Sequence, residues 1–459
     1  MNIAVLNGSP KGDLSVTLQY VRYAAAKFPQ HSFRIFPVAR TIRKIERDES
    51  AFQEIIDAVK NADVVLWSFP LYFFLVCSQY KRFIELIFER KQQEAFAGKY
   101  TVCLSTSVHF FDHTAHNYMH AVCDDLGMNF IGSYSAAMYD LMRGKERKRW
   151  LSFAGHFLDV VNRRAPTPRV YPPLKASPAA YSPGRTAVDI EAQDKRILIL
   201  QDGQEPSGNT DAMVAQLAAC FRGTADVASL MDLDIKGGCL GCCKCGLDNV
   251  CDYQGKDGFV DFYENSVKKA DIVVFAGAIH DRYLSSRWKM FFDRSFYNTH
   301  VPTLAGKQIA YLISGPLAQI PNLRQVLEAY AEFQEANLAG IVTDEEDNST
   351  ETDELMAELA RRLVRPAADI PLQPMTFLGV GGRKIFRDEI YGMLRFVFQS
   401  DYRYYKKHGY FDFPHKNFKV RRMNMMMTTL TKIPPVRRKF LKMLKEQMVK
   451  PVKYIAENR

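Results

Sequence analysis

Short apolar runs alternate with amphipathic stretches along most of this chain. A strand that is apolar throughout is covered on both faces, so this alternation predicts parallel sheets with helices on each side, the α/β class. Ligands of such sheets bind beyond the carboxyl ends of the strands. The apolar runs are Ile3–Leu6, Ala62–Leu66 and Tyr100–Ser105, then Ile197–Leu200, Ala270–Val274 and Gln308–Ile313, and the helical stretches are Leu18–Lys27, Phe52–Lys60, Ala212–Phe221 and Phe259–Lys269.

The two series of elements can be aligned on each other. Three segments pair at a constant offset of 208 residues: Ala62–Leu66 with Ala270–Val274, Lys81–Glu85 with Lys289–Asp293, and Ala97–Lys99 with Ala305–Lys307. Near the start of each half the offset is 194, so the second half has gained 208 − 194 = 14 residues in between. The alignment predicts two copies of one parallel-sheet α/β domain, the second with an insertion.

Proline and charge divide the chain further. Residues 163–185 contain six prolines, which predicts an extended linker. We therefore expect domain 1 over residues 1–162, a linker over 163–194, domain 2 over 195–375 and a basic, mainly helical extension over 376–459. Residues 401–459 carry 16 Lys and Arg against four Asp and Glu, a net charge of +12, so the other 400 residues sum to 10 − 12 = −2.

The insertion is rich in cysteine. Five of the nine cysteines lie in the thirteen residues from Cys239 to Cys251. Without Cys243 the spacing is C-x2-C-x2-C-x5-C, which suits a [4Fe-4S] cluster held by Cys239, Cys242, Cys245 and Cys251. Two alternatives stay open. A zinc site usually has two C-x2-C pairs separated by a longer loop, and the cysteines can instead be reduced or form disulfides.

The loop Asn7–Thr17 connects a predicted strand to a predicted helix. Hydroxyls of Ser9, Ser15 and Thr17, together with the N–H groups of the helix start, can hold a phosphate, although a helix cap and turn would have the same composition. The second half offers Gly203–Thr210 at the same place. Neither loop is a Walker motif, because no Gly-Lys-Ser/Thr follows.

Two further loops contain candidate site residues. Ser68–Phe74 places Tyr72 at a strand end, where it can lie on a flat ring or belong to the core, whereas the corresponding Ala278–Tyr283 is polar. The segment Ser105–His120 contains four histidines. Metal ligation, the wall of a cofactor or substrate cavity, and partial exposure are the hypotheses for them. These histidines are His109, His113, His116 and His120.

Composition and the first residues of the sequence indicate the cellular compartment. Hydrophobic content of 47% and charged content of 24% are typical of a soluble globular protein. The opening Met-Asn-Ile-Ala-Val-Leu-Asn-Gly has no basic leader, and clustered cysteines suit a reducing environment, so we expect a cytoplasmic protein. The uncharged run Val64–Tyr80 is broken by Pro70 and indicates a buried strand with its loop.

Three features together resemble the flavodoxin-like NAD(P)H-dependent FMN reductases. They are Gly8-Ser-Pro-Lys with Ser15 and Thr17 downstream, Pro70-Leu-Tyr72, and Ala270-Asp-Ile-Val-Val ahead of a binding loop. The cysteine loop resembles that of the iron-sulfur flavoproteins in the same superfamily. The resemblance covers residues 1–160 and 195–350, and it implies two tandem flavodoxin-like, doubly wound parallel-sheet domains.

The resemblance implies FMN as a cofactor and assigns residues to it. The implied phosphate contacts are Ser9, Lys11, Ser15 and Thr17, the residues flanking the flavin are Pro70, Leu71 and Tyr72, and those at its edge are Thr106, Ser107 and His109. In the second half Ser207, Asn209 and Thr210 fit the phosphate loop. Because Ala278–Tyr283 departs from Pro-x-Tyr, the number of FMN molecules per chain, one or two, is left open.

The main hypothesis is a flavin oxidoreductase in which hydride passes from NAD(P)H to FMN and single electrons pass to a [4Fe-4S] cluster, an exchange that flavins can perform. One alternative is an electron-transfer flavoprotein without its own nicotinamide site, reduced by a ferredoxin-like partner. Another is a zinc-stabilised flavodoxin-like scaffold. The sequence identifies no catalytic residue and leaves open whether the chain forms a homo-oligomer.

The tail contains a predicted basic amphipathic helix over Val436–Lys450. Phe440, Leu441, Leu444 and Met448 share one face, with Arg437, Arg438, Lys442 and Lys445 largely around the other. The helix can dock on the protein's own body, on an anionic membrane surface or on an acidic redox partner. Nucleic acid is not favoured, since the basic residues accompany a methionine-rich apolar face without a groove-reading motif.

Overall fold

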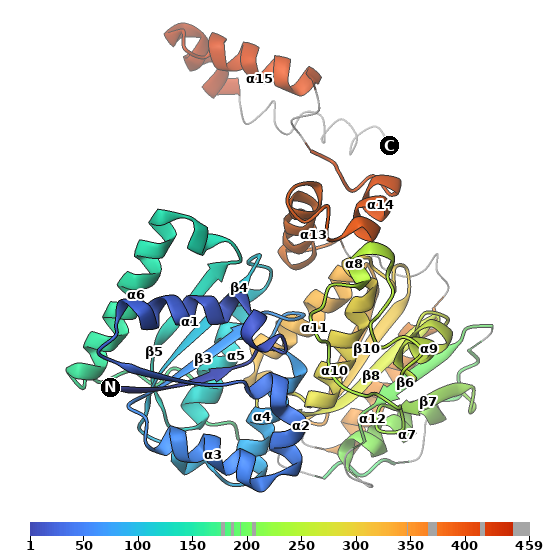
Figure 1. Cartoon of the computed structure of the whole chain (residues 1–459). Coiled ribbons are helices and arrows are strands. Elements are labelled where there is room, and N and C mark those ends of the chain that lie inside the picture. Colours follow the sequence, from blue (N-terminus) through green and yellow to red (C-terminus); the bar gives the residue numbers. More distant parts are fainter. Residues whose placement is uncertain are drawn as a thin grey trace. The chain divides into compact units, whose positions relative to one another are not determined.

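The computed structural model describes residues 1–175, 180–184, 188–192, 194–203, 208–346, 348–365, 374–413 and 418–443. The chain divides into two compact units, Met1–Tyr402 and Arg403–Arg459. The first unit contains two halves, each built on its own mainly parallel sheet (Figure 1).

The first half has five parallel strands in the order β2-β1-β3-β4-β5. Its buried strand residues pack on α1 and α6 to form one core layer, while α3, α4 and α5 cover the other face (Figure 1). The elements are β1 (Asn2–Asn7), α1 (Val16–Lys27), β2 (Ser32–Phe36), α2 (Val38–Arg47), α3 (Glu49–Lys60), β3 (Val64–Pro70), α4 (Ser78–Glu89), β4 (Tyr100–Ser107), α5 (Asp112–Asp125), β5 (Asn129–Ala137) and α6 (Gly144–Asn162).

The second half repeats this strand order as β7-β6-β8-β10-β11, with the short β9 antiparallel to β8. Its core layer lies between the sheet and α7 and α12. The fold-class prediction of two flavodoxin-like doubly wound domains is therefore confirmed. The elements are β6 (Ile197–Gln201), α7 (Asn209–Ala219), β7 (Ala225–Ser229), α8 (Cys245–Asp248), α9 (Phe259–Phe262), β8 (Ile272–His280), β9 (Tyr283–Leu284), α10 (Ser286–Ser295), β10 (Gln308–Ser314), α11 (Pro321–Phe333), β11 (Asn337–Thr343) and α12 (Ser349–Leu363).

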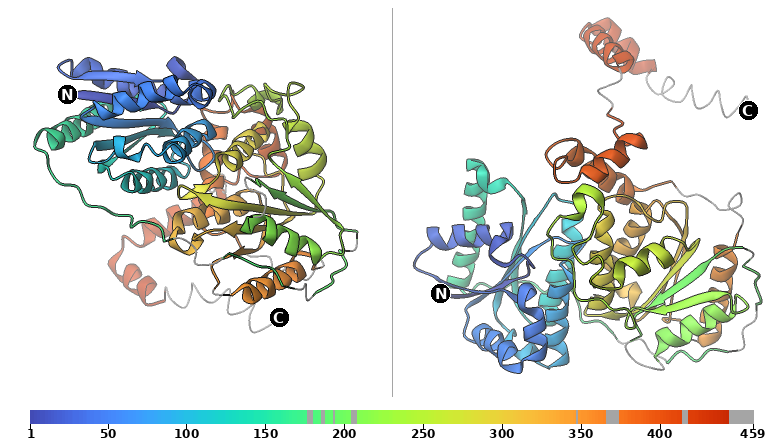
Figure 2. Two further views of the ribbon diagram at one scale, coloured as in Figure 1. Left: turned by 90° about the horizontal axis from the view of Figure 1, so that it is seen from below. Right: turned by 45° about the vertical axis from the view of Figure 1, so that its right-hand side comes forward.

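The halves lie side by side in both views of Figure 2, and α4 and α10 cap each other across their contact. The backbone N–H of Ser78 at the start of α4 donates to the carboxylate of Asp293 in α10 at 2.7 Å. The N–H of Ser286 at the start of α10 donates to Glu85 in α4 at 2.5 Å. Since a carboxylate at a helix N-terminus pairs with free N–H groups and the helix dipole, each half supplies a cap to the other.

A tight turn from each half also crosses this contact. Phe73 and Phe74 follow β3 with positive φ angles of 40° and 68°, and Asp281 and Arg282 follow β8 with φ angles of 48° and 64°. The two turns are 208 residues apart, the offset found in the sequence. The turns therefore have the same backbone course but opposite side-chain chemistry.

Residues beyond α12 belong partly to the first unit. Helix α13 (Phe377–Tyr391) contributes Phe386 and Ile390 to the buried interior, and Leu394 and Phe398 continue this series at four-residue spacing. The predicted domain boundaries remain predictions. The second unit contains α15 (Phe418–Leu430), and α14 (Gln399–Lys407) spans the division between the units.

No helix among the described residues is both long and apolar enough to cross a membrane.

Candidate functional site

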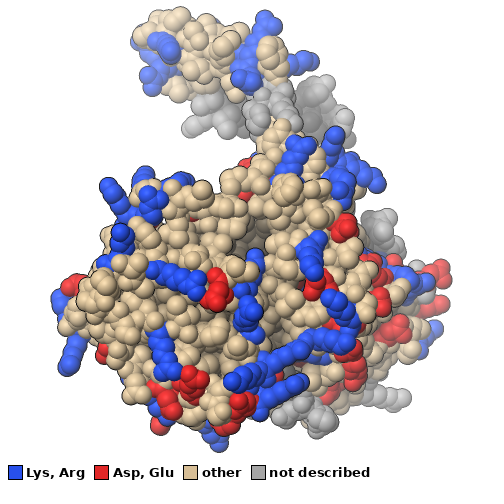
Figure 3. Space-filling model, viewed as in Figure 1, with Lys and Arg blue, Asp and Glu red and all other residues tan. Residues whose placement is uncertain are grey.

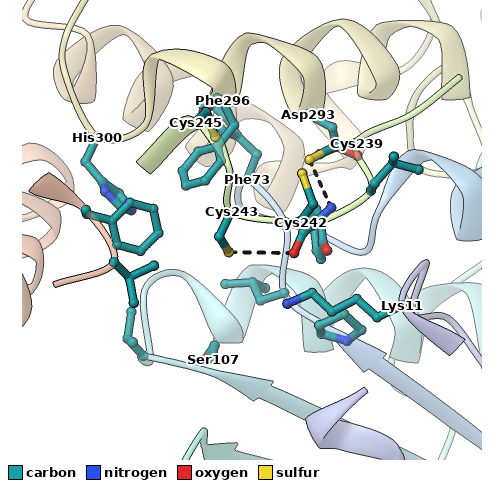
Figure 4. Close-up of a pocket in the computed structure, with 18 of the residues that line it drawn as sticks. Lys11, Phe73, Ser107, Cys239, Cys242, Cys243, Cys245, Asp293, Phe296 and His300 are labelled. Atoms are coloured by element: carbon teal, nitrogen blue, oxygen red, sulfur yellow. Dashed lines mark hydrogen bonds between the residues drawn. The ribbon is translucent and has the colours of Figure 1, made fainter. Parts of the chain in front are cut away.

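A cavity of about 410 Å³ lies between the two halves, at the carboxyl ends of β3 and β4 (Figure 4). This is the sheet edge where the strand pattern predicts ligand binding. The loop after β1 and the ends of β3 and β4 contribute Ser9, Lys11, Ser15, Pro70, Leu71, Tyr72, Thr106 and Ser107, and the second half contributes Cys239, Cys242, Cys243, Cys245, Cys251, Asp293, Phe296 and His300.

The loop after β1 brings three of the predicted phosphate contacts to the cavity wall. Ser9, Lys11 and Ser15 line the wall, and Ser15 caps α1 by accepting a hydrogen bond from Leu18 at 3.3 Å. The N-terminus of α1 and the Lys11 ammonium thus face the same space, which is a favourable setting for an anion. Thr17 differs, because it is fully buried and its hydroxyl lies 2.5 Å from that of Thr106.

The segments expected at the flavin ring follow β3 and β4. Pro70, Leu71 and Tyr72 line the cavity, and the N–H of Leu71 donates to the carbonyl of Thr106 at 3.1 Å, which ties the two strand ends together. Burial raises the pKa of Tyr72 well above 10, so its phenol keeps its proton at neutral pH. Thr106 and Ser107 stand beside it on the adjacent strand.

His109 lies beside the cavity wall in a separate polar group. Its Nδ1 is 2.9 Å from Asp112, and this hydrogen bond raises the pKa of His109. Although burial opposes it, hydrogen bonds from His109 and Ser135 hold the pKa of Asp112 below its usual range. The arrangement is a charge-assisted pair at the cavity's edge.

The cysteine loop of the second half passes close to Tyr72 and Lys11, in the loops after β3 and β1 of the first half. A side chain at Gly241, which has a φ of 63°, would collide with Tyr72 and Lys11, so only glycine allows this approach. The side-chain amide of Gln79 donates to the carbonyl of Cys239 at 3.0 Å. The thiols thereby share a cavity with the first half's predicted phosphate site (Figure 4).

All nine cysteines are free, and the thiols in the loop have different surroundings. Burial raises the pKa of the Cys239 thiol to about 12 and also raises that of Cys245. The thiol of Cys243 lies 3.6 Å from the carbonyl oxygen of Gly241. Within the described ranges no three His, Cys, Asp or Glu side chains are arranged to hold a metal ion, so metal ligation stays a prediction.

The remaining histidines of α5 do not converge either. His113 contacts Gln325 at 3.2 Å, His116 contacts the hydroxyl of Ser105 at 2.8 Å, and the ring of His120 stacks on Phe130. They share a helix face as the spacing predicts, but each packs against a different element.

A carboxylate that follows β11 (Asn337–Thr343) contacts the predicted phosphate loop of the second half. Asp344 accepts hydrogen bonds from the amide of Asn209 at 2.7 Å, the hydroxyl of Ser314 at 2.6 Å and the N–H of Gly315 at 2.8 Å. Ser314 and Gly315 stand 208 residues after Thr106 and Ser107, so the donors at this position are already paired. Thr210 is buried, and Ser207 lies outside the described residues.

Several cavity residues come from segments without a recognised motif. His300 is held at 2.6 Å from the carboxylate of Asp401, and Phe386 and Phe398 line the wall beside it. Phe386, Ile390, Leu394 and Phe398 are spaced four residues apart, which indicates a packed helical face. This spacing is the sequence signal for these cavity residues, within the stretch predicted to be the basic extension.

The family described as NADPH-dependent FMN reductase matches residues 1–140. The matched range includes the loops after β1, β3 and β4 and agrees with the resemblance found in the sequence. No curated protein sequence matches the chain.

Solved structures of flavin enzymes each cover about a third of the chain. An NADH:FMN oxidoreductase in its apo form has 21% identity and a TM-score of 0.30, and it covers 34% of this chain and 87% of its own. The NAD(P)H:(acceptor) oxidoreductase FerB from Paracoccus denitrificans has 16% identity and a TM-score of 0.29, with coverages of 35% and 97%. An FMN-dependent NADH-azoreductase from Bacillus anthracis, in complex with FMN, has 13% identity and a TM-score of 0.27, with coverages of 36% and 99%.

Proposed function

We propose that this protein is an NAD(P)H-dependent FMN oxidoreductase with its FMN in the cavity between the two halves. The observation that carries the proposal is the meeting of three first-half loops, those after β1, β3 and β4, with the cysteine loop of the second half around one cavity. The family match over residues 1–140 supports it from the sequence.

The residues of the cavity fit FMN in their chemistry. Ser9, Lys11 and Ser15, with the N-terminus of α1, would hold the phosphate by charge and hydrogen bonds. Protonated Tyr72 and the neighbouring Leu71 would cover the ring and exclude water from it. Bound FMN would supply hydride acceptance from a nicotinamide and the release of electrons one at a time.

We also propose that Cys239, Cys242, Cys245 and Cys251 hold a [4Fe-4S] cluster. All four line the same cavity, none is in a disulfide, and thiolates are the ligands such a cluster needs. Cys243 adjoins Cys242 in sequence and is left outside the ligand set. A cluster at this place would be next to the flavin site, within one unit of the fold.

We further propose that the halves are two copies of one domain and that one FMN binds per chain. The shared strand order, the reciprocal helix caps of α4 and α10 and the constant offset of 208 support the duplication. Asp344 supports the stoichiometry, because its carboxylate accepts hydrogen bonds from Asn209 of the second loop and from Ser314 and Gly315 after β10, and would repel a phosphate.

Flavin binding can be tested at Lys11, which is exposed and lines the cavity. We expect Lys11→Glu to weaken FMN binding on the order of a hundredfold, since one charge-assisted contact of ~1.5–3 kcal/mol is lost and repulsion is added. Flavin fluorescence during titration of the apoprotein measures this. Lys148→Glu, an exposed site within α6, is the matched control. Equal losses in both variants, or none in Lys11→Glu, would refute the phosphate site.

The cysteines are tested by a pair of variants that differ by one position. We expect Cys242→Ser to abolish the broad brown absorption and the bound iron and sulfide of anaerobically purified protein, and Cys243→Ser to keep both. The reverse result would exchange the two assignments. A colourless protein that contains zinc would support the scaffold hypothesis instead.

Nicotinamide oxidation distinguishes the proposed enzyme from the remaining alternative. The proposed enzyme oxidises NADH or NADPH in the presence of an artificial electron acceptor. Flavin-loaded protein that oxidises neither nucleotide, but is reduced by a ferredoxin, would be an electron-transfer flavoprotein without its own nicotinamide site.

A further inference from the structure

The segment 418–443, here called the basic helical segment, is strongly cationic. The chain has no acidic residue between Asp412 and Glu446, whereas residues 1–400 have a net charge of −2. Positive charge therefore gathers in one short stretch instead of being balanced locally. The basic side chains of this segment are Lys419, Arg421, Arg422, Lys432, Arg437, Arg438, Lys439 and Lys442, all of them exposed.

The same segment also exposes large apolar side chains. Met425 is 69% exposed and Phe418 73% exposed, values far above those of core residues. Monomeric proteins seldom leave such groups together in water unless the surface has a binding role. The exposed apolar side chains are Phe418, Met423, Met425, Met426, Leu430, Ile433, Leu441 and Met443.

In helix α15, several of the apolar side chains share one face. Met423, Met426, Met427 and Leu430 follow the i, i+3, i+4, i+7 spacing that places side chains on one helical face. Arg421 lies on the opposite side. On the face seen in Figure 3, Lys and Arg side chains stand beside uncharged surface on this helix. A further helical stretch over 434–443 also carries basic residues and exposed apolar ones, and the rest of the helix predicted over Val436–Lys450 lies outside the described residues.

We propose that the basic helical segment binds the surface of an anionic lipid bilayer and lies in the plane of its headgroups. An anionic bilayer presents negative headgroups directly above an apolar layer, so it complements the cations and the exposed apolar face together. An acidic protein surface would complement the cations alone. The methionines suit this role, because their flexible side chains adapt to an irregular apolar surface.

The test is sedimentation of the full-length protein with vesicles of phosphatidylcholine alone or of phosphatidylcholine mixed with phosphatidylserine. We expect binding to the mixed vesicles at low salt, little binding to phosphatidylcholine, and loss of binding at high salt. The charge variant Arg421→Gln/Arg422→Gln/Arg437→Gln/Arg438→Gln should bind several hundredfold more weakly, on the order of 600-fold, because each of the four basic residues near anionic lipid contributes about fivefold.

Two further variants make the result specific. Met423→Ser/Met426→Ser/Leu430→Ser should also weaken binding, since the apolar face is needed to enter the headgroup layer. The control Lys44→Gln/Arg47→Gln/Lys145→Gln/Lys148→Gln removes the same charge from exposed positions on α2 and α6 and should bind as the unmodified protein does.

Three results would overturn the proposal. The first is equal binding of the charge variant and the control. The second is an oligomer that the serine variant dissociates, in a protein that does not bind vesicles, which would assign the face to a second copy of the chain. The third is unchanged vesicle binding after truncation at Thr431 together with a lower melting temperature, which would assign the helices to the protein's own body.

Discussion

The turn after β3 and the turn after β8 both connect the two halves, but they do so with different side chains. Each leaves its own half and enters the other with two consecutive residues of positive φ. In the first half these are Phe73 and Phe74, and the ring of Phe74 lies 6.3 Å from that of Phe333. In the second half the position of Phe74 is taken by Arg282, which pairs with Asp125, 208 residues before Phe333.

The difference between the turns coincides with the difference between the sites. The apolar turn follows Tyr72 and belongs to the wall of the cavity, where an aromatic side chain excludes water. The ionic turn follows His280, and its two charged side chains form ion pairs with the first half. Asp281 pairs with Lys81, and Arg282 pairs with Asp125. The same backbone thus serves a predicted flavin site on one side and an interdomain lock on the other.

The largest expected effect comes from the apolar turn. Phe74 is 1% exposed and packs edge to face on Phe111 with ring centres 4.7 Å apart. We expect Phe74→Ala to lower the free energy of unfolding by about 4 kcal/mol, the usual cost of a cavity left by a buried ring. Urea denaturation measures this, and Phe377→Ala, at an 83% exposed ring, is the control. A loss equal to that of the control would mean that the turn does not hold the halves together.

The ionic turn should have a somewhat smaller effect. Arg282 donates to both oxygens of Asp125, at 2.5 and 2.7 Å, and to the carbonyl of Pro172. We expect Arg282→Ala to cost about 3 kcal/mol, because a largely buried carboxylate loses its partner. Arg34→Ala, at the exposed pair with Glu54, should cost about 0–1 kcal/mol by the same denaturation experiment.

The two turns can also be made alike. We expect the double variant Arg282→Met/Asp125→Leu to stay within about 1 kcal/mol of the unmodified protein, since an apolar pair of similar volume replaces a buried ion pair at little cost. A loss as large as that of Arg282→Ala would show that the charge itself, and not the filling of space, is needed at this turn.

Another effect depends on pH and arises behind the apolar turn, at His116. Burial lowers the pKa of His116 from 6.5 to about 4. The unfolded chain therefore binds a proton between these values while the folded protein does not, so stability is full above pH 6.5 and falls as the pH approaches 4. The loss at pH 5 should be about 2 kcal/mol. Denaturation over this range measures the slope, which His116→Gln should remove if His116 is its source.

Local sequence was sufficient for the sheets and for the loops at their carboxyl ends. Runs such as Ile3–Leu6 and Ile197–Leu200 are apolar at every position, and only a strand covered on both faces buries them completely. The loops at Ser9, Pro70 and Thr106 then had to meet at one edge, because parallel strands end together. The loss of the repeat and the basic, aromatic composition predict an extension that begins at residue 376, and this boundary stays a prediction. The apolar spacing from Phe386 to Phe398 is typical of a packed helical face.

The sequence by itself determined the element order, the repeat offset and the cysteine spacing, because these depend on neighbours along the chain. Only the tertiary structure decided that the cysteine loop covers the first half's loops and that Asp344 pairs with Asn209 and Ser314 in the second half. The tertiary structure also brings the hydroxyl of Thr17 to that of Thr106, a residue 89 positions away in sequence. Such contacts depend on how two sheets pack against each other, and the periodicity of a single strand or helix carries no information about its distant partner.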